Sequence, residues 1–213
     1  MKKISIIGLG YVGLPLLLQI AKKKEVFGFD INKKRINQLS KGIDDYNEHT
    51  FQEIKKVKKN LILTSDINKT ENSDLFIVTV PTPVDKKNKP DLSFIINATR
   101  NISPMLKKNS IVVYESTVFP GCTEEVCAPI LEKISKLEFN KEFYCGYSPE
   151  RINVGDSKHT IQSITKIVAG SNLKTTKLLS NFFKKYVSKK IYSSSSIKVA
   201  EAAKVIENTQ RDI

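Results

Sequence analysis

The sequence of 213 residues predicts a doubly wound α/β fold, in which helices cover both faces of one parallel sheet. Short apolar runs alternate along the chain with longer segments of helical pattern, the order that crossover connections between parallel strands require. In addition, a glycine-rich turn joins the first apolar run to the first helical segment. We expect this fold to occupy residues 1–195 and a separate, long helix to begin in residues 196–213.

The first strand and helix carry the most informative motif. Ile4–Ile7 is a short apolar run, GLGYVG follows at residues 8–13, and Leu14–Ala21 has a helical pattern. The spacing G-x-G-x-x-G between a strand and a helix is typical of the Rossmann dinucleotide-binding turn. A helix that starts there offers free N–H groups and the positive end of its dipole to phosphates.

Each glycine of this turn has a separate expected role. Gly8 allows the tight turn, Gly10 lets a pyrophosphate approach the backbone, and Gly13 lets the helix lie close to the strand. The alternative is a secretion signal, with Lys2 and Lys3 before an apolar run. We disfavour it because QIAK, at the end of that run, is a poor cleavage site.

The second expected strand, Val26–Phe29, ends at an acidic residue. Asp30 stands 17 positions after Gly13, close to the spacing of about 20 at which an acid binds the adenosine ribose. A carboxylate there also repels a 2′-phosphate, which favours NAD over NADP. Lys34 and Arg35 follow, and they could either stack on adenine or be solvated charges on a helix.

The remaining elements continue the alternation. Strands are expected at Leu61–Thr64, Leu75–Val80, Ile111–Tyr114, Phe143–Gly146, Ile164–Ala169 and Lys190–Tyr192. Helices are expected at Asn32–Ser40, Phe51–Lys59, 93–106, Thr123–Lys136, Asn172–Lys185 and from Ser196 onwards. Polar turns (Pro81-Thr82-Pro83, Glu115-Ser116-Thr117 and Ser148–Arg151) follow three of the strands. Ligands bind beyond the carboxyl ends of the strands in such sheets, so we expect these turns to form one site.

The composition excludes several classes of protein. The formal net charge is +13, but the lysines are scattered along the chain without interleaved aromatic residues, which argues against nucleic-acid binding. A solvated lysine-rich surface explains the charge, and it would help to attract an anionic nucleotide. The sequence predicts no membrane span, and no metal site was identified. Three cysteines, an odd number, argue against a disulfide framework and favour the reducing cytoplasm.

The last expected helix has two distinct faces. Its donors lie at i, i+4 and i+7, which places Lys204, Asn208 and Arg211 on one face. A second, apolar stripe consists of Val199, Ala202, Ala203 and Ile206. We expect the apolar stripe to be buried and the donors to face an anionic or hydroxyl-rich ligand. An exposed helix with ordinary surface charges is the alternative.

Five motifs in order resemble one enzyme family. They are IIGLGYVGLP, VPTP, ESTVFPGCTEE, GYSPERINVGD and AEAAKVIENTQRDI, and together they cover the whole chain. The chain is similar to the nucleotide-sugar 6-dehydrogenases of the UDP-glucose/GDP-mannose dehydrogenase family, nearest the branch that oxidises UDP-N-acetylhexosamines for capsular or Vi-type polysaccharides. The resemblance implies that the C6 alcohol of a UDP-sugar becomes a carboxylate, through a cysteine-bound thiohemiacetal and thioester, with two NAD used in sequence.

The resemblance also implies roles for individual residues. NAD would contact the glycine turn and Tyr11, Val12, Asp30, Arg35, Thr82, Thr117 and Thr123. Glu150 would activate water for thioester hydrolysis, Lys204 would stabilise the charge that develops on the C6 oxygen, and Asn208 and Thr117 would assist in catalysis. Arg151, Ile152, Lys204, Asn208 and Arg211 would bind the sugar nucleotide. Three simpler roles stay open: a strand-ending turn for Thr82, a strand-end cap for Thr117, and a surface pair with Arg151 for Glu150.

The chain also departs from the family pattern. The family's catalytic cysteine lies in a glycine-rich segment of a second, C-terminal domain, and neither is found here. Cys122 precedes an expected helix, where a thiolate is favoured, but its neighbours match the cofactor motif. The last helix ends without a terminator; in the family it is long, joins the two domains and helps to form a homodimer. We therefore expect an N-terminal part that binds NAD and oxidises little or no sugar.

Two other interpretations remain. Dehydrogenases of the 6-phosphogluconate or hydroxyacid type share the glycine turn, but they give no reason for ESTVFPGCTEE followed by SPER. A non-catalytic NAD-binding module shares the cofactor motifs and leaves Lys204 and Glu150 unexplained.

Overall fold

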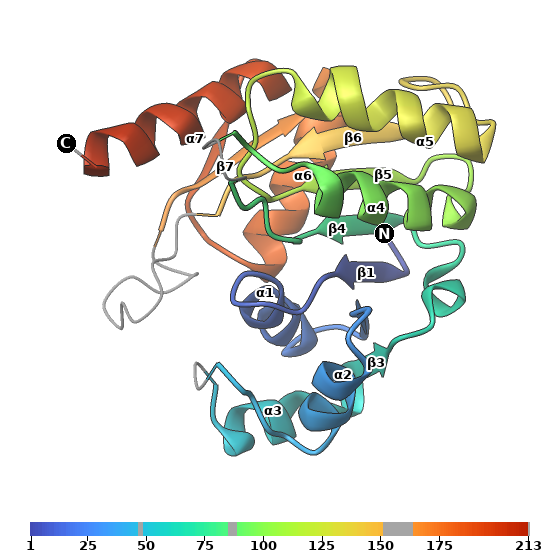
Figure 1. The fold of residues 1–213 in the computed structure, drawn as a ribbon, viewed down its shortest axis with the longest axis vertical. Coiled ribbons are helices and arrows are strands. Elements are labelled where there is room, and N and C mark those ends of the chain that lie inside the picture. The colour runs from blue at the N-terminus through green and yellow to red at the C-terminus, as the bar shows by residue number, and fades with distance from the viewer. Residues whose placement is uncertain (47–48, 85–88, 151–163, 213) are drawn as a thin grey trace.

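The computed structural model describes residues 1–46, 49–84, 89–150 and 164–212. Its centre is an eight-stranded sheet of order β3-β2-β1-β4-β5-β6-β7-β8 (Figure 1). The strands are β1 (Ile4–Ile7), β2 (Val26–Phe29), β3 (Leu61–Thr64), β4 (Leu75–Val78), β5 (Ile111–Tyr114), β6 (Tyr144–Tyr147), β7 (Lys166–Gly170) and β8 (Ile191–Ser193).

Six strands are parallel, and the last two run the other way. Strands β1 to β6 pair in parallel, whereas β7 pairs antiparallel to β6 and β8 is parallel to β7. The doubly wound α/β class is confirmed, and the reversal is the one departure from a wholly parallel sheet. The sequence does not predict this reversal, because an apolar run has the same pattern whichever way the strand runs.

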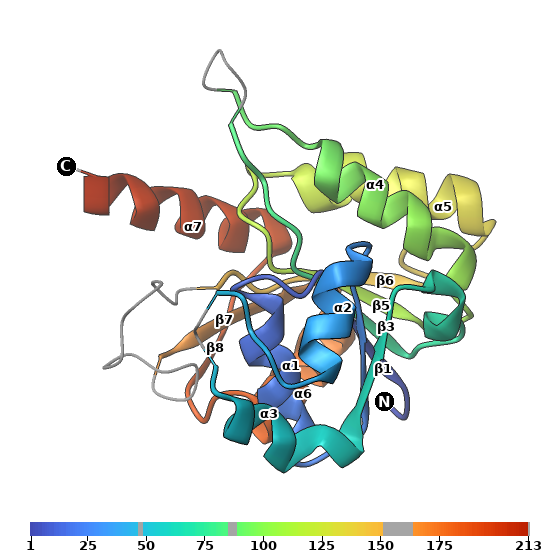
Figure 2. The same cartoon turned by 60° about the horizontal axis from the view of Figure 1, so that its bottom comes forward.

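Helices cover both faces of the sheet (Figure 2). One face packs against α1 (Gly13–Ala21), α2 (Lys33–Ser40), α3 (Phe51–Val57) and α6 (Leu173–Tyr186). The other packs against α4 (Ser93–Ile102), α5 (Ala128–Ser135) and α7 (Ile197–Asp212). The alternation of side chains along a strand divides the core: in β4, Leu75 and Ile77 face the first group, and Phe76 and Val78 face the second.

Element boundaries agree closely with expectation, with three exceptions. The helix expected at Phe51–Lys59 ends at Val57 and continues as the 3₁₀ turn Lys58–Asn60. The helix expected at 93–106 ends at Ile102 and continues as the short 3₁₀ turn Ser103–Met105. The helix expected at Thr123–Lys136 begins with the π-helical segment Cys122–Cys127 before α5. Through the described parts of the chain, every helix is too short or too polar to cross a bilayer.

The turn between β1 and α1 is tightly packed at one glycine and open at another. Gly8 has a φ of 95°, which only glycine adopts without strain. A Cβ on Gly13 would lie 1.9 Å from the carbonyl oxygen of Gly8 and 2.5 Å from Thr79 Oγ1. The hydroxyl of Thr79 donates to that same carbonyl at 2.7 Å. A Cβ on Gly10, by contrast, would meet no atom within 4 Å.

Gly13→Ala is therefore expected to destabilise the fold by roughly 2 kcal/mol or more, because the new methyl must displace backbone. The measurement is urea unfolding followed by circular dichroism. Gly10→Ala is the matched control, since its methyl enters open space and should leave the unfolding midpoint close to that of the wild type. Equal midpoints for Gly13→Ala and the wild type would contradict the close approach.

Candidate cofactor and catalytic site

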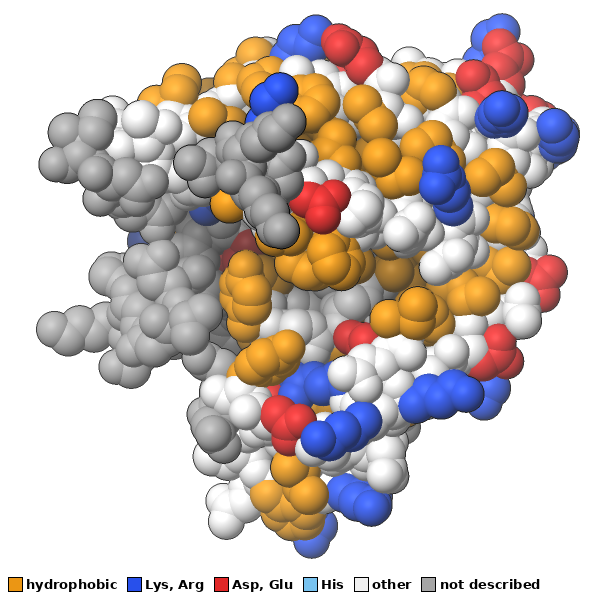
Figure 3. Space-filling model, in the orientation of Figure 1, with side chains coloured by type: hydrophobic (Ala, Val, Ile, Leu, Met, Phe, Trp, Pro, Cys, Tyr) orange, Lys and Arg blue, Asp and Glu red, His pale blue; other side chains and the backbone are white. Residues whose placement is uncertain are grey.

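A pocket of about 1010 Å³ opens at the carboxyl ends of the parallel strands. It spans the point between β1 and β4 where the strand order reverses, which is where doubly wound sheets bind ligands. Figure 3 shows the hollow in this face of the molecule, with hydrophobic side chains along its margin. The predicted site residues that line it are Gly8, Gly10, Tyr11, Val12, Asp30, Arg35, Thr82, Thr117, Glu150, Lys204 and Asn208.

Asp30 connects two loops at one end of the pocket. Its Oδ2 accepts a hydrogen bond from the backbone N–H of Leu9 at 2.8 Å, and its Oδ1 accepts from that of Asn32 at 2.8 Å. Asn32 in turn caps α2 by accepting from the N–H groups of Lys34 and Arg35. The carboxylate is thus fixed at the end of β2 beside the glycine turn, as a ribose-binding acid requires.

Arg35 is buried rather than solvated, with 5% of its surface exposed. Its Nε donates to the carbonyl of Leu9 at 3.0 Å, and one terminal nitrogen donates to Asp44 at 2.7 Å. The guanidinium carbon lies 4.6 Å from the centre of the Tyr46 ring. The other terminal nitrogen, NH2, is buried without a hydrogen-bond partner in the described structure. The surface-charge alternative is wrong for Arg35, whose buried guanidinium holds the glycine turn at the edge of the pocket.

The loops after β4 and β5 are joined by side chains. The hydroxyl of Thr82 donates to the carbonyl of Thr117 at 2.6 Å, and that of Ser116 donates to the carbonyl of Val80 at 2.5 Å. Tyr147 of β6 donates to the carbonyl of Ser116 at 3.2 Å. Thr82 and Thr117 are therefore fixed relative to each other at the pocket wall, an arrangement that suits both a turn role and a ligand-binding role.

Three charged side chains meet beneath the pocket wall. Lys166, the first residue of β7, places its Nζ 3.1 Å from Glu115 Oε2 and 3.2 Å from Glu150 Oε2. The side chains of Lys166 and Glu150 are 4% and 9% exposed, and that of Glu115 is fully buried. Both carboxylates line the pocket. Glu115 Oε1 has no hydrogen-bond partner in the described part of the chain. We call this group the buried triad.

Burial and neighbouring charges shift the pKa values of Glu115 and Lys166. Loss of solvent raises the pKa of Glu115 from 4.5 to about 7; Lys166 opposes this rise and Glu150 adds to it. Burial alone would lower the pKa of Lys166, but the two carboxylates raise it above its usual value. Lys166 therefore stays an ammonium, whereas the carboxyl of Glu115 changes its protonation near neutral pH.

Helix α7 places Lys204 in the pocket from the other side. Lys204 is 7% exposed, and its Nζ lies 3.9 Å from Glu207 Oε2. One turn earlier, the fully buried Glu201 accepts hydrogen bonds from the backbone N–H groups of Gly121, at 2.5 Å, and Thr123, at 2.9 Å. These bonds connect α7 to the loop that follows β5, and so they fix the helix that carries Lys204 and Asn208.

The predicted burial of the apolar stripe of α7 is wrong, whereas Lys204 and Asn208 of its donor face line the pocket. The face of α7 that packs on the sheet consists of Ile197, Ala200, Glu201 and Lys204. Val199 and Ile206 of the expected apolar stripe are 51% and 59% exposed. The reason is that Glu201 accepts hydrogen bonds on the domain side and Lys204 lines the pocket there. Hydrophobicity alone therefore does not decide which face of α7 is buried.

Some predicted residues lie elsewhere. Gly13 and Thr123 are outside the pocket lining: Gly13 packs against Gly8 behind the turn, and Thr123 is buried beside Glu201. Arg151 and Ile152 lie outside the described residues, as does the side chain of Arg211. Across the residues that are described, no cluster of His, Cys, Asp or Glu is suited to hold a metal ion.

The cysteines have the character of core residues. All three are buried and carry free thiols. A hydrogen bond with Cys127 and burial raise the pKa of Cys122, so its thiolate is disfavoured despite the helix start. Burial likewise raises the pKa of Cys145. This agrees with the interpretation of Cys122 as part of a cofactor motif rather than as a nucleophile.

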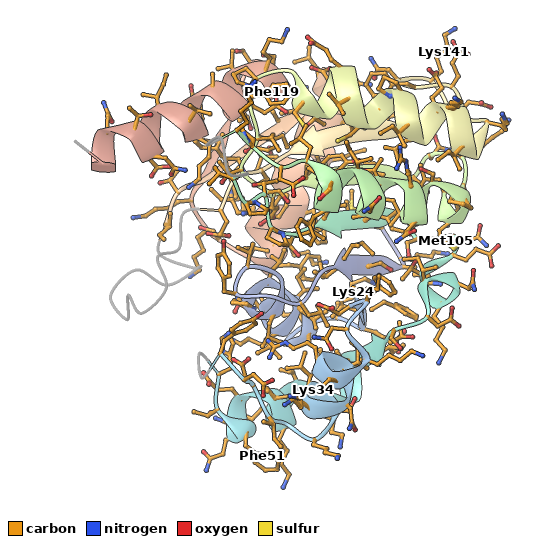
Figure 4. All side chains as sticks on the ribbon, in the orientation of Figure 1. Lys24, Lys34, Phe51, Met105, Phe119 and Lys141 are labelled. Carbon is orange, nitrogen blue, oxygen red and sulfur yellow. The ribbon has the colours of Figure 1, made fainter. Side chains whose placement is uncertain are left out.

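The sequence did not point to four residues of the site. Lys166 and Glu201 hold its walls through ion pairs and hydrogen bonds, and Asn97 and Asn101 of α4 line the pocket. Lysine at the start of an apolar strand was a signal for Lys166, because an unpaired lysine is rarely buried. Glu201 and the two asparagines belong to ordinary helical patterns and gave no comparable signal. Lysines are dispersed over the molecule: in Figure 4, Lys34 lies in the lower part and Lys141 at the top.

The pocket fits a dinucleotide. The open space beside Gly10 and the N-terminus of α1 suit a pyrophosphate, and Asp30 suits a ribose next to it. The chain also matches, over residues 2–194, the model of the NAD-binding domain of the UDP-glucose/GDP-mannose dehydrogenase family. The chain belongs to this family. NAD is accordingly the cofactor of the domain.

Individual relatives agree with this assignment. The chain is 50% identical to UDP-N-acetyl-D-glucosamine 6-dehydrogenase of Salmonella typhi, covering 99% of this chain and 49% of that protein. It is 47% identical to protein CapL of Staphylococcus aureus, with coverage of 100% and 50%. The UDP-D-ManNAc dehydrogenase structure from Pyrococcus horikoshii superposes with a TM-score of 0.92 at 29% identity, covering 99% and 50%. The chain thus spans about half the length of these relatives.

The tie between α7 and the β5 loop is testable. Glu201→Ala leaves two buried N–H donors unpaired and is expected to cost roughly 2–4 kcal/mol of unfolding free energy, as measured by urea denaturation. Glu125→Ala is the control: Glu125 pairs with Lys198 on the surface, so its loss should cost less than about 1 kcal/mol. A similar small effect for both variants would show that Glu201 does not hold the helix.

Proposed function

We propose that this chain is the NAD-binding part of a nucleotide-sugar 6-dehydrogenase, which oxidises the C6 hydroxyl of a UDP-N-acetylhexosamine to a carboxylate. The observation that supports it most is the convergence of three groups on one pocket: the glycine turn with Asp30, the triad carboxylates, and Lys204 with Asn208. A module that only bound NAD would have no use for a buried lysine and two buried carboxylates there.

The residues on one side of the pocket would bind NAD. NAD supplies the hydride acceptor when bound, and two oxidations of one carbon consume two molecules of it. The backbone of the glycine turn would bind the pyrophosphate, and Asp30 would accept a hydrogen bond from the adenosine ribose. Thr82, Thr117 and Arg35 lie in the wall and would orient the dinucleotide. Tyr11, half exposed in the glycine turn, borders the same space.

The substrate side of the pocket is formed by α7 and the segment after β6. Lys204 would place an ammonium near the C6 oxygen and stabilise negative charge that develops there, and Asn208 would add a donor on the same helix face. Glu150 would accept a proton from the water that hydrolyses the thioester. Arg151, Ile152 and Arg211 would bind the sugar nucleotide, and Thr123 would support the cofactor loop from behind.

The wider context is also proposed from the family. The enzyme would act in the cytoplasm on a UDP-sugar, as a homodimer that contains α7 near its interface, and its product would enter a capsular or related polysaccharide. The catalytic cysteine would come from sequence that is not in this chain.

Calorimetric titration tests the cofactor assignment. We expect one NAD per chain and much weaker binding of NADP, because the carboxylate of Asp30 repels the 2′-phosphate. Asp30→Asn should narrow the NAD/NADP preference by roughly tenfold, or about 1.4 kcal/mol. Asp74→Asn is the control. Asp74 immediately precedes β4, at the edge of the sheet opposite the pocket, where it pairs with Lys107. Absence of NAD binding would overturn the proposed function.

A kinetic test separates the enzyme from a sensor. This chain alone should bind NAD and produce little or no NADH from UDP-N-acetylhexosamine. Steady NADH production would show that it needs no further residues for turnover. In a protein that carries this chain together with the cysteine domain, Lys204→Ala should abolish turnover and keep NAD affinity, because Lys204 serves the alcohol. Unchanged turnover would remove Lys204 from the mechanism.

A further inference from the structure

The buried triad has a feature that the proposed function does not use. Lys166 contacts two carboxylates and can neutralise the charge of one of them. Glu150 already has a proposed role in hydrolysis, whereas Glu115 has none. Glu115 is fully buried at its side chain, and one oxygen faces Lys166 while the other, Oε1, has no partner in the described structure. Because Glu115 is among the residues that line the pocket, its buried carboxyl lies next to whatever the pocket holds.

The position of Glu115 indicates which part of a dinucleotide lies nearest. The two halves of a doubly wound sheet bind one mononucleotide each, on either side of the switch point. The glycine turn and Asp30 lie at the ends of β1 and β2, on the adenosine side. Glu115 directly follows β5 and, with Thr82 and Thr117, lies on the other side, which is left for the nicotinamide half.

The two forms of the cofactor differ in charge at that half only. The nicotinamide ring is a cation in NAD⁺ and neutral in NADH, whereas the pyrophosphate and the riboses are unchanged. A cation favours the ionised form of a nearby carboxyl, and the effect is strong where the surroundings are dry. A half-titrated buried carboxyl on this side of the pocket would therefore sense the redox state of the cofactor.

We propose that Glu115 is a redox-linked proton site: its carboxyl releases its proton when NAD⁺ binds and keeps it when NADH binds. This inference rests on the proposed function, because it requires the nicotinamide half to lie on the β5 side. Lys166 is the positioning residue that holds Glu115 beside Glu150, with its ammonium 5.3 Å from the centre of the Phe183 ring on α6.

The other charged groups around Glu115 set the range in which it responds. Lys166 on β7 contacts Glu115, and Glu150 after β6 contacts the same ammonium. Tyr147 on β6 lies near enough for the charge of Glu115 to raise its pKa, and Lys204 on α7 lines the same pocket. The pKa of Tyr147 is raised by burial, so its hydroxyl stays protonated. Because the pKa of Glu115 is raised to about 7, this carboxyl gains or loses its proton at neutral pH.

Calorimetry in buffers of different ionisation enthalpy measures the protons released. At a pH equal to its pKa, Glu115 is half protonated, so NAD⁺ should release up to about half a proton per site near pH 7. NADH should release none or take up protons. The release should fall toward zero at a pH well above the pKa, where the carboxyl is already ionised. In Glu115→Gln, NAD⁺ and NADH should give equal proton counts.

Two controls make the result decisive. Glu125→Gln, an exposed carboxylate paired with Lys198, should keep the wild-type difference. Carbon-13 NMR of glutamate carboxyls in the unmodified chain avoids any folding defect of the variant: one carboxyl that titrates near pH 7 should move to lower pH with NAD⁺ and stay with NADH.

The possible failures are distinguishable. If both cofactors bind but release equal numbers of protons, or if Glu115→Gln keeps the difference, the inference is wrong and the proposed function stands. If neither cofactor binds, the proposed function fails and the inference fails with it.

Discussion

The direction of β7 is the constraint on which the chemistry of this site depends. The antiparallel register pairs Tyr147 with Ala169, and three further steps in that register bring Glu150 opposite Lys166. A parallel β7 would instead place Lys166 at the opposite edge of the sheet, far from the strand ends where the pocket lies. The ammonium could then not reach Glu115 and Glu150, and two carboxylates would be buried beside each other without a cation. Such an arrangement costs several kcal/mol unless one of them is protonated.

A second constraint keeps the two walls of the pocket together. The loop after β5 carries Glu115 and Thr117 and then continues to Gly121, whose N–H donates to Glu201 of α7. The same helix carries Lys204 one turn later, so a single buried carboxyl group couples the cofactor wall to the lysine. Displacement of that loop would move α7 with it. A site assembled from strand ends on one side and a helix on the other needs such a tie, because helix and loop are joined by no sheet hydrogen bonds.

The sequence predicted most of this architecture, and the failures have identifiable causes. The glycine turn, Asp30 and the strand ends were predictable because local spacing encodes them. The direction of β7 was not, since an apolar run has the same pattern whichever way it runs. The same is true of Lys166, whose partners become neighbours only through that direction. The periodicity of α7 predicts two distinct faces, but Glu201 has hydrogen-bond partners on the domain side and Lys204 lines the pocket there, so Val199 and Ile206 face outward. Pairings between distant segments decided each of these cases.

Under the proposed function, one site would serve two cofactor molecules in sequence, and the charge of the pocket would assist this exchange. If both triad carboxylates are ionised, the triad carries one net negative charge, which favours a cationic nicotinamide and disfavours a neutral one. A fixed charge of this kind would favour NAD⁺ over NADH, but it would also leave an uncompensated carboxylate at a buried position each time the cofactor left. A carboxyl of Glu115 that takes up a proton removes this cost. Alcohol oxidation releases one proton for each hydride transferred, so the proton that Glu115 needs on formation of NADH arises in the same step, and its return to solvent accompanies entry of the next NAD⁺.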